Sequence, residues 1–150
     1  MSGEVTASSW QPWLVWALLS AVFAALTAIF AKIGLEGVDS DYATLVRTAV
    51  IIVVLGAFVG LSGKWQSPAT LTTRSGLFLV LSALATGASW VCYFRALKIG
   101  EATRVAPIDK LSVVLVAIFA VLVLGERPSL RDWVGIASIT VGVILLSLKR

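Results

Sequence analysis

Five apolar segments, each close to the length of a membrane-spanning helix, constrain this chain more than any other feature of its sequence. A hydrocarbon core of about 30 Å requires about 20 residues of helix. The connections between the segments are short, and the segments lie at about residues 13–31, 42–61, 76–97, 105–124 and 132–148. None of them alternates polar and apolar residues as a membrane β-strand would. The sequence therefore predicts an all-α polytopic membrane protein, a bundle of five transmembrane helices that follows an N-terminal tail of residues 1–12.

The composition agrees with lipid as the solvent of this chain. Hydrophobic residues make up 59% of the sequence and charged residues only 13%, and the mean hydropathy is +0.98. A soluble domain of 150 residues could not bury so much apolar surface. Residues 1–12 contain no Lys or Arg, so the basic region of a secretory signal is missing and the first segment is predicted to be a retained span.

The residue types that most catalytic and metal sites require are scarce. The sequence has no histidine, and Cys92 is its only cysteine, so no intrachain disulfide can form. It contains no Ser–His–Asp set, no metal-ligand spacing and no phosphate-binding loop. The net charge of +4 fits basic loops and is weak evidence for nucleic-acid binding. The sequence predicts a protein that is not an enzyme, with no metal, no cofactor and no nucleic-acid partner.

Local signals mark where helices begin and how they could pack. Asp39, Ser40 and Asp41 are candidate caps for the second helix, and Ser129 with Asp132 has the spacing of a capping box for the fifth. Small residues recur at helical spacing, which in lipid predicts close approach of helix backbones. These residues are Gly56 and Gly60, then Ala83 and Gly87, then Gly135, Ser138 and Gly142.

The distribution of basic residues predicts the orientation of the bundle. Five spans place the two termini on opposite sides of the membrane. Four Lys or Arg residues lie on the N-terminal side and eight on the other, which favours an outside N-terminus and an inside C-terminus. The four are Lys64, Arg74, Arg127 and Arg131, and the eight are Lys32, Arg47, Arg95, Lys98, Arg104, Lys110, Lys149 and Arg150. Without Arg47 and Lys110, which lie inside predicted spans, the bias falls to six against four.

Charges inside two predicted spans point to a functional site. Arg47 lies about two turns into the second helix, and Asp109 and Lys110 lie one to two turns into the fourth. Both helices start on the C-terminal side, so these charges reach similar depths, on the order of 10 Å at 1.5 Å per residue. Buried charges should pair or line an aqueous cavity. We expect Arg47 to pair with Asp109, and Pro107 to kink or break the helix beside them.

Other residues near that end allow both a functional and a structural interpretation. Trp90 and Tyr93 are three residues apart and could line a pocket, or could pack as aromatic residues commonly do. Arg95 lies at the same helix end and is included in the predicted substrate or ion pathway. Lys32, Lys98 and Arg104 are expected to extend to lipid headgroups. The predicted pathway therefore consists of Arg47, Trp90, Tyr93, Arg95, Pro107, Asp109 and Lys110.

Three stretches in order resemble the EamA-like branch of the drug/metabolite transporter superfamily. They are YFRALKIGEATRVAPI at 93–108, VLVLGERPS at 121–129 and WVGIASITVGVILL at 133–146. They share an aromatic-ALxxG end of the third helix, a proline that opens the fourth, LGE that closes it, and a glycine-spaced fifth helix. The resemblance covers the chain from residue 13 to residue 148, which would form one five-helix transmembrane domain. It is similar to the five-span bacterial and archaeal transporter group.

The resemblance implies export or exchange of small metabolites by alternating access, in the inner membrane of a prokaryote. Most members of that branch have ten spans arranged as two inverted five-span repeats. A single repeat could rebuild the site by homodimerisation, including an antiparallel arrangement. The four-span multidrug members keep a carboxylate in the middle of the first helix, whereas this first helix has none. Asp109 is therefore the candidate proton carrier.

Three functions remain open at this point. The first is a secondary transporter of small polar metabolites, for which a zwitterion such as an amino acid suits the near balance of acidic and basic residues. The second is a lipid-linked flippase or its accessory subunit, with membrane lipid as the partner. The third is a non-transporting membrane interaction protein whose charges only set its topology.

Overall fold

The computed structural model describes residues 12–148, and these form helices joined by short loops. The helices are α1 (Pro12–Gly34), α2 (Ser40–Leu61), the 3₁₀ turn η1 (Pro68–Thr70), α3 (Thr73–Ile99), α4 (Ala102–Asp109), α5 (Ser112–Phe119), the π-helical turn η2 (Ala120–Leu124) and α6 (Leu130–Ser147). Almost all of the predicted tail of residues 1–12 lies outside the described residues, as do Lys149 and Arg150.

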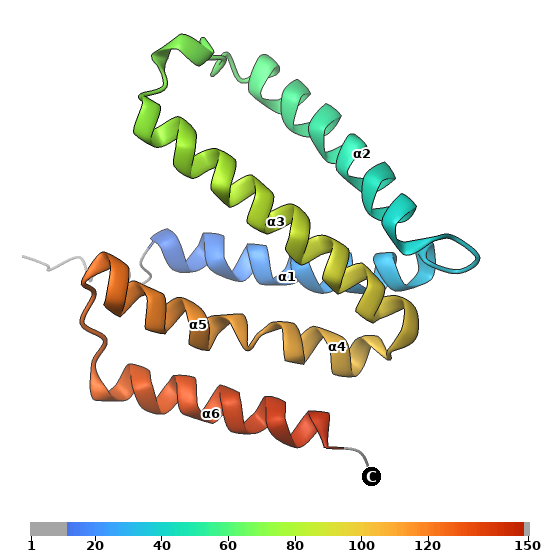
Figure 1. The fold of residues 1–150 in the computed structure, drawn as a ribbon, viewed down its shortest axis with the longest axis vertical. Coiled ribbons are helices and arrows are strands. Elements are labelled where there is room, and N and C mark those ends of the chain that lie inside the picture. The colour runs from blue at the N-terminus through green and yellow to red at the C-terminus, as the bar shows by residue number, and fades with distance from the viewer. Residues whose placement is uncertain (1–11, 149–150) are drawn as a thin grey trace, which may run out of the picture.

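Five helices are long and apolar enough to cross a membrane, with α4, α5 and η2 together forming the fourth. No strand occurs among the described residues, so the predicted all-α class with five spans is confirmed. The described chain begins at the left of Figure 1 and ends at the right, at the opposite end of the bundle. This is the arrangement that an odd number of spans requires.

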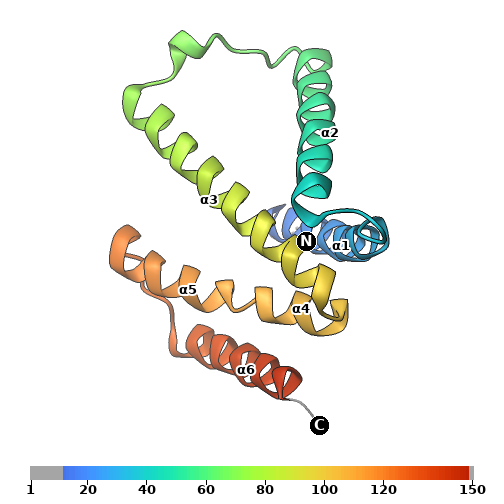
Figure 2. The ribbon, with the colours of Figure 1, turned by 45° about the vertical axis from the view of Figure 1, so that its right-hand side comes forward.

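The helices form two groups that meet at one end of the molecule. Helix α3 contacts α2, α1 and α4, while α4 also contacts α1 and α6. The α2–α3 hairpin leans away from the remaining helices, and its two helices separate toward the loop that contains η1 (Figures 1 and 2). Leu35, Phe94 and Leu97 form a small buried core where the α1–α2 connection meets the end of α3. The two groups are therefore joined firmly at one end only.

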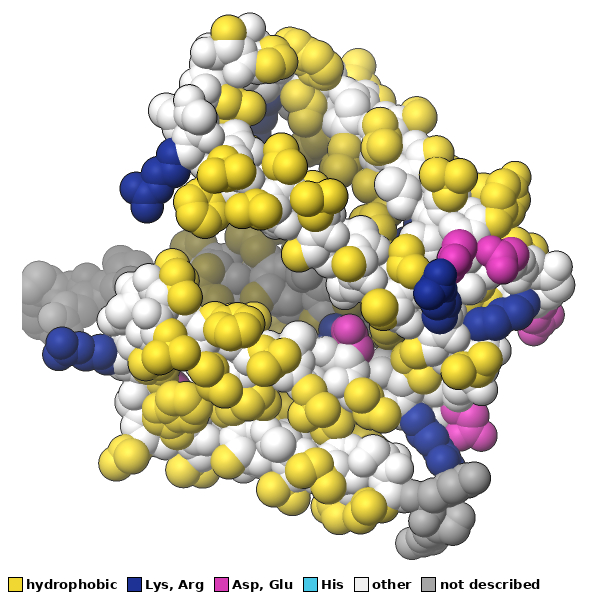
Figure 3. All heavy atoms as spheres, viewed as in Figure 1, with side chains coloured by type: hydrophobic (Ala, Val, Ile, Leu, Met, Phe, Trp, Pro, Cys, Tyr) yellow, Lys and Arg dark blue, Asp and Glu magenta, His cyan; other side chains and the backbone are white. Residues whose placement is uncertain are grey.

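Most large apolar side chains are exposed, as lipid permits. Apolar side chains dominate the face seen in Figure 3, while charged ones gather at the right, where the α1–α2 and α3–α4 connections lie. A Cβ atom added at Gly56, Gly60, Gly87, Gly135 or Gly142 would meet nothing within 4 Å. The prediction that these glycines bring helices together is therefore wrong for contacts within the chain. No neighbouring helix packs directly against these glycines.

Helix starts follow the predicted caps. The Asp39 carboxylate accepts hydrogen bonds from the backbone N–H groups of Asp41 and Tyr42, at 2.9 and 3.0 Å. Ser129 and Asp132 form the predicted capping box, each side chain accepting from the backbone N–H of the other. These caps satisfy N–H groups that a helix cannot pair internally. Both caps fix the entry of a span at a defined residue.

Two lysines connect the C-terminal ends of α1 and α3. Lys32 of α1 donates to the carbonyls of Leu97 and Gly100, at 2.6 and 2.8 Å. Lys98 of α3 donates in return to the carbonyls of Leu35 and Val38, at 2.6 and 2.7 Å. An ammonium group is favourable beside the unpaired carbonyls and negative dipole end of a helix. The expectation that Lys32 and Lys98 extend to headgroups is therefore wrong.

A third basic residue expected to reach headgroups, Arg104, is also engaged within the chain. Its Nε lies 3.1 Å from a carboxylate oxygen of Glu101, one helical turn earlier. Both side chains are largely exposed, so this pair adds little to stability.

Candidate functional site

The fourth span is interrupted next to its charged residues. Helix α4 ends at Asp109 and α5 begins at Ser112. Pro107 has no backbone N–H, and the turn that follows it is tightened by bonds from the Lys110 N–H to the Pro107 carbonyl and from the Leu111 N–H to the Ile108 carbonyl, each 3.0 Å. The span is thus broken just beyond Pro107 rather than smoothly kinked. The break places Asp109 and Lys110 at a discontinuity inside the span.

At this break, the Lys110 ammonium lies 3.3 Å from a carboxylate oxygen of Asp109. The Asp109 side chain is 38% exposed and that of Lys110 is 55% exposed. Neither group is sealed in a dry core, so each is available to a solute in an adjoining cavity. The pair joins successive residues, and the Lys110 ammonium offsets the negative charge of the Asp109 carboxylate.

Arg47 has an aromatic partner instead of an acidic one. Its guanidinium carbon lies 4.1 Å from the ring centroid of Trp90 and 5.4 Å from that of Phe94. Such cation–π contact attracts a cation to the face of an aromatic ring. Within residues 12–148, Arg47 makes no hydrogen bond and no ion pair. The predicted direct pair between Arg47 and Asp109 is therefore wrong. The Asp109 carboxylate pairs with Lys110, and the Arg47 guanidinium lies over the ring of Trp90.

Arg47 and Asp109 nevertheless line the same cavity, which lies among α1, α2, α3 and the α4–α5 break. Its volume is about 450 Å³. Five of its lining residues were predicted for the pathway: Arg47, Trp90, Tyr93, Asp109 and Lys110. The others are Ser20, Phe23, Ala24, Thr27 and Ser89. We call this space the polar cavity.

Sequence reasoning missed the hydroxyl groups that α1 contributes to the polar cavity. Ser20 and Thr27 are seven residues apart, so they project from nearly the same face of the helix. That spacing of two polar residues in an otherwise apolar span was the available signal. Ser89 adds a third hydroxyl from α3, next to Trp90.

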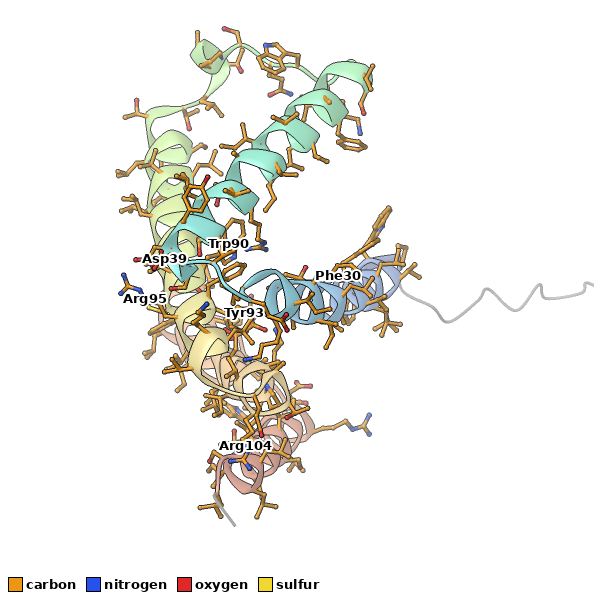
Figure 4. The ribbon with its side chains drawn as sticks, turned by 90° about the vertical axis from the view of Figure 1, so that its right-hand side faces the viewer. Phe30, Asp39, Trp90, Tyr93, Arg95 and Arg104 are labelled. Carbon is orange, nitrogen blue, oxygen red and sulfur yellow. The ribbon has the colours of Figure 1, made fainter. Side chains whose placement is uncertain are left out.

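Two predicted pathway residues lie elsewhere. Arg95 donates to both carboxylate oxygens of Asp41, at 2.8 and 2.6 Å, and does not line the polar cavity. Figure 4 shows its side chain directed away from α1, on the opposite side of α3 from Tyr93. Pro107 lines a neighbouring cavity of about 630 Å³ among α1, α4 and α6, which Tyr93 and Lys110 also line. Arg95 therefore joins α3 to the start of α2, and Pro107 lies two residues before the helix break.

A second, apolar space also reaches Arg47. This groove of about 510 Å³ lies between α1 and α2. Phe30, Gly34, Tyr42 and Val46 are among the residues that line it, and both Arg47 and Thr27 border it as well as the polar cavity. We call it the apolar groove. Arg47 therefore stands where a polar space and an apolar space meet.

Comparison with known proteins gives one family. The profile of the EamA-like transporter family matches residues 11–148. The chain is 59% identical over 137 residues to an uncharacterized transporter from the cobO 3′ region of a Sinorhizobium species, which covers 91% of this chain and 97% of that protein. No solved structure matches the chain.

Two more distant relatives differ from each other in length and in described role. The chain is 28% identical over 87 residues to a probable 4-amino-4-deoxy-L-arabinose-phosphoundecaprenol flippase subunit, ArnE, of Proteus mirabilis, covering 57% of this chain and 77% of that one. It is 25% identical over 144 residues to the uncharacterized transporter YxxF of Bacillus subtilis. That alignment covers 91% of this chain but only 43% of YxxF, so the second relative is more than twice as long.

Proposed function

The chain belongs to the EamA-like transporter family, and from that premise we propose that it is a secondary transporter that exports or exchanges small polar metabolites, such as amino acids, by alternating access. It is a multi-pass membrane protein. Its relatives are bacterial, which supports the inner membrane of a prokaryote as its location. The observation that carries the proposal is the polar cavity with Arg47 and Asp109 beside a broken span.

The position of the cavity suits one half of an alternating-access cycle. Its residues come from the middle of α1, the C-terminal half of α3, the early part of α2 and the α4–α5 break, so the cavity lies within the spans rather than at the end of the bundle. A solute would occupy this space in one state of the cycle. The α2–α3 hairpin is the element suited to move, because it leans away from the other helices and joins them mainly at one end (Figure 2).

A second copy of the chain would supply the other half of the passage. Relatives of greater length, such as YxxF, match this chain over less than half of their sequence. The glycine-bearing faces of α2 and α6 are open within one chain and would allow a neighbouring helix to approach closely. We propose a homodimer, and the antiparallel arrangement is the one that an inverted-repeat family implies.

Antiparallel assembly makes a prediction about topology. Arg47 and Lys110 line a cavity rather than a loop, so the charge bias that orients the chain falls to six against four. We expect a C-terminal tag to be reached from both sides of the membrane. The measurement is protease or labelling access to the tag in intact cells and in inverted vesicles. A tag found only inside would overturn the antiparallel homodimer and favour a parallel dimer or another subunit.

Counterflow in proteoliposomes tests the transporter proposal itself. The purified protein is reconstituted with a panel of unlabelled metabolites inside, and accumulation of the matching labelled solute is measured. At least one polar metabolite should accumulate above the level of protein-free liposomes. A flat response across the panel, with correctly inserted protein, would favour a non-transporting interaction protein.

One observation favours a second candidate, a flippase for a lipid-linked solute. Arg47 borders the apolar groove as well as the polar cavity, so a charged head and a hydrocarbon tail could be held together. The ArnE relative carries a flippase description, although its identity to this chain is only 28%. A scrambling assay with a fluorescent lipid separates the two candidates, because only a flippase would move the lipid between leaflets.

A further inference from the structure

The charges around the polar cavity do not balance. Arg47 and Lys110 are cationic and Asp109 is anionic, and no other ionisable acid or base of the Asp, Glu, Lys or Arg type lines this space in the described chain. Lys110 already offsets Asp109 at 3.3 Å. Arg95, which could have been counted here, is bound to Asp41 outside the cavity. The cavity therefore retains one uncompensated positive charge, and that charge is on Arg47.

An uncompensated guanidinium at this depth is energetically unfavourable unless it meets an anion or water. The cation–π contact with Trp90 offsets part of that cost. It leaves the five N–H donors of Arg47 without a hydrogen-bond acceptor among residues 12–148. The ring of Trp90 also restricts where the guanidinium can lie. The result is a preorganised donor group that faces a space large enough for a solute.

Neutral donors complete the surroundings of this group. The hydroxyls of Ser20, Thr27, Ser89 and Tyr93 line the same cavity. A carboxylate or phosphate has more acceptor positions than one guanidinium can fill, and hydroxyl groups can donate to the remaining oxygens. Planar, bidentate recognition of such anions is the task for which Arg is better suited than Lys.

We propose that Arg47 binds an anionic group of the substrate, a carboxylate or a phosphate, and that the transported species carries net negative charge. This inference rests on the proposed transport function and adds the charge of the transported solute to it. A net-neutral zwitterion fits less well, because its ammonium group would have to compete with Lys110 for Asp109. The anionic group could belong to a soluble metabolite or to a lipid headgroup, since Arg47 borders both the polar cavity and the apolar groove.

Binding is tested directly, without a transport assay. The full-length protein in neutral detergent is titrated with inorganic phosphate and with succinate, against sodium chloride at equal ionic strength, and its thermal stability is followed. A ligand that binds the folded state raises the melting temperature. A parallel arm compares nanodiscs of phosphatidylcholine with nanodiscs that contain phosphatidylglycerol. The variants are Arg47→Gln, Arg47→Lys and, as a matched control, Arg74→Gln at the far end of α3.

For wild type and Arg74→Gln we expect stabilisation by phosphate or succinate beyond that of chloride. In Arg47→Gln the apparent affinity should fall by about tenfold or more, the usual effect of losing a hydrogen bond to a charged group. Arg47→Lys should lie between them. Stabilisation by phosphatidylglycerol alone, lost in Arg47→Gln, would assign the anion to a lipid headgroup and support the same inference.

Two outcomes would overturn the inference. One is an equal response of wild type and Arg47→Gln to every anion, and the other is no response of wild type beyond chloride in either arm. Counterflow measurements distinguish failure of this inference from failure of the transporter proposal. If Arg47→Gln still accumulates a solute that wild type transports, the protein is a transporter and only the role of Arg47 is wrong.

Discussion

Replacing Asp109 by asparagine is expected to abolish transport while the protein still inserts and folds. Asparagine keeps the shape of the side chain but cannot ionise, so Lys110 loses its counter-ion and the polar cavity gains a second uncompensated positive charge. Asparagine also cannot carry a proton, so any proton-coupled step through this residue is lost. We expect flux to fall to the level of protein-free liposomes.

The measurement is counterflow of a transported solute in proteoliposomes, with folding monitored by circular dichroism and size-exclusion chromatography. Asp39→Asn is the matched control, because asparagine caps a helix about as well as aspartate and Asp39 lies outside the cavity. It should transport as wild type does. Unchanged flux in Asp109→Asn would remove Asp109 from the pathway and leave it a structural role at the helix break.

Replacing Lys32 by methionine is expected to destabilise the protein more than the same change at any exposed lysine. Methionine keeps most of the apolar stem but leaves the carbonyls of Leu97 and Gly100 without their donor. Lys32 is half-buried, so water replaces the ammonium group poorly. A hydrogen bond to a charged group contributes about 1.5–3 kcal/mol, and we expect a loss of about 2 kcal/mol.

The loss would be measured as a lower free energy of unfolding in mixed micelles of increasing denaturing detergent. Lys98→Met should have a smaller effect because Lys98 is exposed, although its contacts are equally short. Lys64→Met serves as the control, since Lys64 is exposed in the loop that joins α2 to η1. If Lys32→Met were as stable as Lys64→Met, the lysine contacts between α1 and α3 would not be stabilising.

The span boundaries and the helix break were accessible to sequence reasoning because their causes are local. Helix α2 begins at Ser40 because Asp39 caps it, two residues before the predicted start. Helix α6 begins at Leu130, directly after the predicted capping residue Ser129. The break at Asp109 lies two residues beyond Pro107, the proline from which a kink or break in this segment was predicted. Such effects need no knowledge of the neighbouring helices.

The partners of the charged residues were less accessible. Arg95 was assigned to the pathway, but it binds Asp41, which was considered only as a cap near the start of α2. The shared membrane side of the two residues was the only available signal, and Arg47 and Asp109 shared that side equally. Membrane side and depth limit the possible partners of a charge without choosing among them.

The amino-acid sequence by itself determined that this protein has five spans, no alternating β-pattern and an interrupted fourth span beside an acid and a base. These properties depend on the length, hydropathy and backbone chemistry of single segments in lipid. Only the tertiary structure decided that Arg47 lies on Trp90, that Arg95 pairs with Asp41, and that two lysines exchange contacts between α1 and α3. The physical reason is that a side-chain contact acts over only a few ångströms, so it depends on which faces of packed helices meet.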